Sequence, residues 1–93
     1  MAANITSLKR TRAGVKSKLT RFRQYIDAYE PNEVNQIELK VRLERAEEFL
    51  TEFNNCQDKI RDLDIDEKLT DELNEENTSF ESLHFPAIAK ARQ

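Results

Sequence analysis

The chain has 93 residues, of which 35% are charged and 38% hydrophobic, with one glycine, two prolines and no tryptophan. This length makes a single domain over residues 1–93, near the lower limit for an adequate hydrophobic core. Helix-forming residues dominate and turn-forming residues are scarce, so the composition predicts an all-α fold and excludes a β-protein. The net charge of −3 argues neither for nor against nucleic acid.

Cysteine usage and hydropathy indicate where the protein works. The lone Cys56 precludes an internal disulfide and is typical of a reducing, intracellular setting, with the cytoplasm expected and the nucleus as the alternative. No apolar run is long enough for a transmembrane helix. Lys9 and Arg10 interrupt the N-terminal sequence too early for a signal peptide.

The first expected helix covers residues 5–29 and combines an apolar seam with many bases. A three-four spacing places the seam on one helical face, with Arg12 where an apolar residue is expected. Residues 1–26 carry no acid, whereas residues 27–93 carry all 18. The bases therefore contact either acids of this chain or an external anion, and they are candidate anion-binding residues. The set is Lys9, Arg10, Arg12, Lys16, Lys18, Arg21 and Arg23.

Two further helices are expected, over residues 32–63 and 66–92. Pro31 separates the first two, and the segment 64–67 separates the last two. The second helix has an apolar stripe wide enough to contact two neighbours, so we expect it at the centre. Pro86 is expected to kink the third helix. The residues predicted to pack the helices together are Leu8, Val15, Leu19, Phe22, Ile26, Leu39, Leu43, Ala46, Phe53 and Ile60.

Short connections favour antiparallel neighbours. We therefore expect a three-helix up-down-up bundle, or a long helical hairpin with a third helix packed along it. Arg12 is expected to be the least exposed base, and internally neutralised bases bind nucleic acid weakly. Because the third helix has few apolar residues between Leu73 and Phe80, part of the first helix's seam is expected to stay exposed as a partner site. The expected hairpin register pairs Lys16 with Glu47 and Glu48, Arg12 with Glu52 or a neighbouring acid, and Lys18 and Arg21 with Glu44.

No set of residues suited to catalysis, metal binding or a cofactor stands out. Cys56 and His84 are the only nucleophile–base pair, and they fall on different expected helices. One histidine and one cysteine without ligand spacing argue against a metal site. The acidic run near Asp64 lacks the glycine and the distal glutamate of a calcium loop. The sequence predicts a protein that is not an enzyme and needs no cofactor.

Three segments carry helix-packing patterns in a fixed order: 8–12 with Lys16 and 19–22, then 43–46 with Phe49, Phe53 and Ile60, then 80–85 with Ala87 and 89–91. Together they resemble the gag-like N-terminal region of BEL/Pao-type LTR retrotransposon polyproteins, over about residues 8–92. Pro86 departs from the family pattern. The resemblance implies an architectural role, in a Gag-type structural protein or in a host gene derived from one. The enzymes of such polyproteins lie downstream.

Three functions are consistent with these features. The first is an interaction module whose helices self-associate during particle or complex assembly, as a homodimer or small homo-oligomer with the dimer favoured, or with another helical protein. The second is a matrix-like module whose basic helix binds RNA or an acidic membrane. The third is a monomeric helical spacer. The chain ends inside the expected third helix, which predicts a domain excised from a longer protein.

Overall fold

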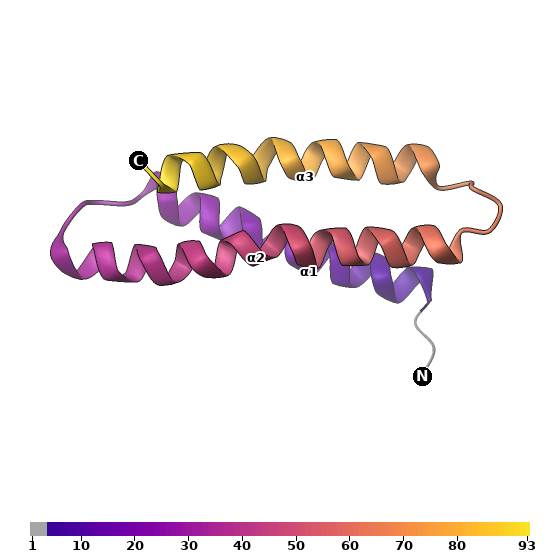
Figure 1. Ribbon diagram of the computed structural model, residues 1–93, viewed down its shortest axis with the longest axis horizontal. Helices are drawn as coiled ribbons and strands as arrows, with labels where there is room; N and C mark the ends of the chain where they lie inside the picture. The colour runs from indigo at the N-terminus through magenta and orange to yellow at the C-terminus, as the bar shows by residue number, and fades with distance from the viewer. Residues whose placement is uncertain (1–3) are drawn as a thin grey trace.

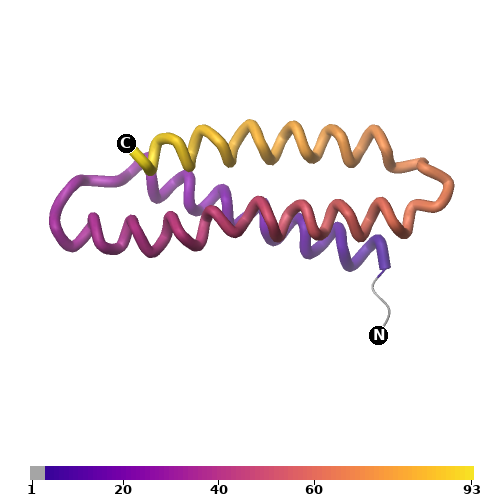
Figure 2. Tube along the Cα trace, viewed as in Figure 1, coloured from indigo at the N-terminus to yellow at the C-terminus, as the bar shows by residue number. Residues whose placement is uncertain are grey.

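The computed structural model describes residues 4–93, so the first three residues of the expected domain lie outside the described part. It contains three helices: α1 at Ile5–Asp27, α2 at Glu33–Leu63 and α3 at Thr70–Ala91 (Figure 1). Each helix contacts the other two, and no strand occurs over residues 4–93. The chain reverses at one end between α1 and α2 and at the opposite end between α2 and α3 (Figure 2). The predicted all-α, up-down-up three-helix bundle is confirmed.

Asparagine side chains cap the first two helices. The Asn4 Oδ1 accepts a hydrogen bond from the backbone N–H of Ser7 at 2.8 Å, within a capping box. The Asn32 Oδ1 accepts one from the backbone N–H of Asn35 at the same distance. Each cap satisfies one of the backbone donors that a helix start leaves without a partner. These caps account for helix starts at or next to the expected positions.

The third helix begins at Thr70, four residues later than the expected start at residue 66. The carboxylate of Asp64 accepts hydrogen bonds from the backbone N–H groups of Lys68 at 3.1 Å and Leu69 at 2.8 Å. Glu67 has a φ of 55°, in the left-handed region that breaks a right-handed helix. Asp64 therefore holds a turn over this segment, and the turn delays the start of α3.

Pro86 lies inside α3, which continues to Ala91. A proline in a helix interior leaves the carbonyl four residues earlier, here that of Ser82, without its helical donor. Both residues are exposed, so water can reach that carbonyl. The kink expected near residue 86 stays a prediction.

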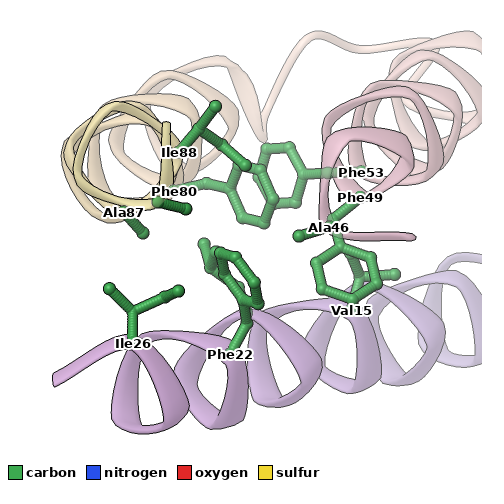
Figure 3. Packing of buried hydrophobic residues seen from close by; sticks show 11 residues of the cluster. Val15, Phe22, Ile26, Ala46, Phe49, Phe53, Phe80, Ala87 and Ile88 are labelled. Carbon is green, nitrogen blue, oxygen red and sulfur yellow. The ribbon is translucent and has the colours of Figure 1, made fainter. Parts of the chain in front are cut away.

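The core consists of two apolar clusters separated by polar side chains. Figure 3 shows the larger cluster, in which residues of all three helices meet. The rings of Phe53 and Phe80 stack there with centroids 4.1 Å apart. The smaller cluster joins Leu8, Ile60 and Leu73. Eight of the ten residues expected to pack the helices are buried, while Leu39 and Leu43 are partly buried against the larger cluster. The buried eight are Leu8, Val15, Leu19, Phe22, Ile26, Ala46, Phe53 and Ile60.

Candidate functional site

The polar side chains between the two clusters form a layer that joins all three helices. Arg12, which is only 5% exposed, donates one hydrogen bond to the Gln57 Oε1 at 2.8 Å and another to the Glu72 Oε1 at 2.9 Å. The Gln57 Nε2 donates to the Leu73 carbonyl at 2.8 Å and to the Asn77 Oδ1 at 2.9 Å. We call these residues the polar layer. As expected, Arg12 is the least exposed base of α1.

Two lysines beside the polar layer contact carboxylates of α3. The Lys9 Nζ lies 3.0 Å from Glu72, and the Lys16 Nζ lies 2.8 Å from Glu76. Hydrogen bonds from Lys9 and Arg12 hold the pKa of Glu72 below its usual range, because they favour the charged carboxylate. The acids of α3 thus neutralise much of the basic helix.

The remaining four bases lie at or near the surface. The Lys18 Nζ is 3.9 Å from Glu52 on α2, and the Arg23 guanidinium is 3.9 Å from Asp27 on the same helix. Within residues 4–93, Arg10 and Arg21 have no carboxylate within 4.0 Å. Five of the seven candidate anion-binding bases therefore face a carboxylate of this chain.

The specific pairs predicted for the hairpin are wrong. Arg12 and Lys18 contact residues of α2 about one heptad away from their expected partners. A shift by one heptad keeps the same apolar faces together, so the apolar pattern alone does not select the register. Lys16 and Arg12 contact glutamates of α3 instead of α2. Lys18 contacts Glu52 instead of Glu44, and Arg21 contacts neither of these two glutamates.

The nucleophile–base pair suggested by composition is not assembled. The His84 Nε2 lies 3.1 Å from the carbonyl of Ala46, ten residues before Cys56 on the same helix. That spacing corresponds to about 15 Å along the helix axis. Burial raises the pKa of the Cys56 thiol, which keeps it protonated and unreactive. Both side chains belong to the packed interior.

Three exposed apolar side chains share one face of α2, and the expected exposure of the α1 seam is wrong. The five packing residues predicted on α1 are all buried in the two apolar clusters: Leu8, Val15, Leu19, Phe22 and Ile26. At the seam position between Leu8 and Val15, Arg12 contacts Gln57 and Glu72 instead.

Val34, Ile37 and Val41 are instead 75%, 66% and 63% exposed. Their three-four spacing places them on one face of α2, and we call them the α2 stripe. Leu63, Ile65 and Phe85 are also exposed, away from the α2 stripe.

The α2 stripe stays uncovered because it faces away from the core. Leu39 and Leu43 lie in the same turns of α2 and pack against the larger cluster, and the helical period places the stripe on the opposite side of the helix. Helix α2 has 31 residues and α3 has 22. At the end of α3, Arg92 contacts Glu47 at 3.3 Å, so the earlier turns of α2 extend past α3 (Figure 1). The signal in the sequence was the spacing of the stripe relative to Leu39 and Leu43, which places the two sets on opposite faces of one helix.

The fold and this surface define a small helical bundle with one exposed apolar stripe. Over residues 4–93, no helix is long and apolar enough to cross a membrane. The same residues contain no group of histidine, cysteine, aspartate or glutamate side chains arranged to hold a metal ion. No protein-family model, curated protein or solved structure matches the chain.

Proposed function

We propose that this protein is a non-enzymatic assembly module that self-associates through the α2 stripe. The observation that carries the proposal is the exposure of three apolar side chains on one face of α2, whereas the ten residues predicted to pack the helices are buried or partly buried. Contiguous apolar side chains rimmed by charged residues are typical of interaction sites. An intracellular, Gag-like structural role, in a retrotransposon polyprotein or a gene derived from one, fits such a module.

The charges beside the α2 stripe favour a second copy in antiparallel orientation. Glu33 and Lys40 lie along one flank of the stripe, and Glu38 and Arg45 lie along the other. A parallel pair would place Glu33 against Glu38 and Lys40 against Arg45, which is like against like. An antiparallel pair instead places Glu33 of each copy against Lys40 of the other. Neither Glu33 nor Lys40 has an ion pair within the described residues, so both are available.

The short stripe predicts a weak dimer. Burying each of its side chains contributes at most about 1.5–3 kcal/mol. Association costs at least about 4 kcal/mol in lost translational and rotational freedom. A dissociation constant in the micromolar to millimolar range follows, and the dimer forms only at high local concentration, as in an assembling particle.

Sedimentation equilibrium over a concentration series tests the proposal. The mass of the wild-type protein should rise from 10.9 kDa towards twice that value. Ile37→Glu should stay monomeric, because it places a carboxylate within the apolar contact. Ile65→Glu is the matched control, since Ile65 is 89% exposed in the α2–α3 connection, away from the stripe.

Each result separates the hypotheses. A wild-type mass that stays at the monomer value would favour the helical spacer. If Ile37→Glu dimerises as strongly as the Ile65→Glu control, the interface lies elsewhere than on the α2 stripe. Circular dichroism should show that both variants keep the helical fold, because both substituted side chains are exposed.

The matrix-like alternative has less support. Binding to RNA or an acidic membrane needs free cations, whereas five of the seven bases of α1 lie against carboxylates. Any nucleic-acid binding by this helix should therefore be weak at physiological salt.

A further inference from the structure

A groove between α1 and α2 combines cationic walls with an apolar floor. Its cationic side chains are Lys18 and Arg21 of α1 and Arg42 and Arg45 of α2. Phe22, Phe49 and Val41 line it from below and at one edge, and no lining residue is acidic. Only Val41 belongs also to the α2 stripe, so the groove is a separate surface on the neighbouring side of α2.

Aromatic rings and carboxylates outside the groove hold its two α2 arginines in place. The Arg42 guanidinium lies 4.3 Å from the centre of the Tyr25 ring and donates to Glu38 at 3.1 Å. The Arg45 guanidinium lies 5.3 Å from the centre of the Phe49 ring and contacts Glu52 at 2.8 Å. Positioned guanidinium groups lose little conformational freedom when they bind a carboxylate.

Arg21 is the cation of the groove that lacks a partner. It is exposed, and no carboxylate of the described residues lies within 4.0 Å of it. The contact between Lys18 and Glu52 is 3.9 Å long, which is too long for a hydrogen bond. The α1 wall of the groove therefore carries positive charge that this chain does not neutralise.

The cationic side chains of the groove and its apolar floor together indicate which kind of ligand fits. A nucleic-acid backbone has phosphates but no apolar ridge to lie on Phe22, Phe49 and Val41. A bilayer surface is broad, whereas this site is a groove between two helices. An amphipathic helix with carboxylates beside its apolar face matches both features, and arginine binds carboxylates through a planar fork. We propose that this groove binds an acidic amphipathic helix of a partner protein.

Fluorescence anisotropy with a designed probe tests the inference. The probe is a fluorescein-labelled peptide helix with leucines along one face and glutamates on both flanks. The protein carries Ile37→Glu, which removes self-association and leaves the groove intact. Adding Arg21→Glu should weaken binding about tenfold, because it reverses the free charge of the groove. Arg10→Glu is the matched control on the same helix, since Arg10 is also exposed and without a carboxylate within 4.0 Å.

The remaining outcomes are decisive as well. Equal loss of binding in the two arginine variants would indicate diffuse attraction and overturn the inference. A peptide with glutamine in place of glutamate should not bind. If it binds as tightly as the acidic peptide, the charge of the groove does not contribute to recognition. Tighter binding of phosphatidylserine vesicles or a single-stranded oligonucleotide, lost in Arg21→Glu, would make the groove a phosphate site and overturn the peptide proposal. Salt should weaken binding of the acidic peptide.

Discussion

Arg12 occupies a seam position on α1, and its guanidinium contacts residues of both other helices. Removing an arginine from water costs free energy that its hydrogen bonds only partly return, so its net contribution to stability is small. Its contribution to specificity is larger. A shift of α1 by one heptad would keep apolar faces in contact but separate Arg12 from Gln57, leaving buried polar groups without partners. The polar layer therefore selects the observed register.

Substitutions in the polar layer should be strongly non-additive. Arg12→Leu should lower the free energy of unfolding by about 1–3 kcal/mol, because the buried Gln57 Oε1 loses its donor. Adding Gln57→Leu should restore part of that loss, since it removes the buried Oε1 that lacks a donor. The recovery is incomplete because the Leu73 carbonyl and the Asn77 Oδ1 lose the Gln57 donor. Urea unfolding followed by circular dichroism measures the effect. Lys16→Ala, which removes a partly exposed ion pair, is the control and should cost less than about 1 kcal/mol. Additive losses in the double variant would contradict this account of the layer.

At the scale of the helices, apolar periodicity predicted most of the architecture. Three helices, their order and their packing faces follow from three-four spacing, and Pro31 and the asparagine caps mark the first connection. The start of α3 was missed because Asp64 satisfies backbone donors of a turn, a use of aspartate that the sequence pattern does not distinguish from a helix cap. The partners of the bases were missed because heptad patterns repeat every seven residues, so they leave the register open.

The exposed site was also misplaced at this scale. Helix α3 has few apolar residues between Leu73 and Phe80, so the sequence indicated that this stretch of α3 could not cover the α1 seam. In the structure Gln57 and Asn77 cover that stretch through hydrogen bonds. The uncovered face lies on α2, on the side of the helix opposite Leu39 and Leu43, which pack against the larger cluster.

The orientation of the proposed dimer can be tested with charge reversals on α2. Glu33→Lys alone and Lys40→Glu alone should each weaken self-association, because each creates like-charge contacts with the second copy. The double variant Glu33→Lys with Lys40→Glu should recover wild-type association, since each attractive contact is restored with reversed sign. Sedimentation equilibrium measures all four proteins. Failure of the double variant to recover, while Ile37→Glu remains monomeric, would reject the antiparallel orientation and retain the stripe.

At the scale of the whole molecule, the uneven charge along the sequence is largely resolved within the bundle. The basic N-terminal helix lies against acidic side chains of α3, so opposite charges far apart in sequence become neighbours. Two of the features that the bundle leaves without partners are the α2 stripe and, on the neighbouring side of α2, the groove with Arg21. Both features lie toward the end of the bundle where α2 extends past α3. That end is where partners are expected to bind.

The most direct test of self-association is a dilution series of ¹⁵N-labelled protein followed by two-dimensional NMR. Diluting a weak dimer shifts the amide signals of residues at the interface more than those elsewhere. The largest changes should fall on Val34, Ile37 and Val41, with Glu33 and Lys40 beside them, while signals of the α2–α3 connection stay constant. Spectra that do not change with concentration, or changes confined to another face, would contradict the proposal that this bundle assembles through the α2 stripe.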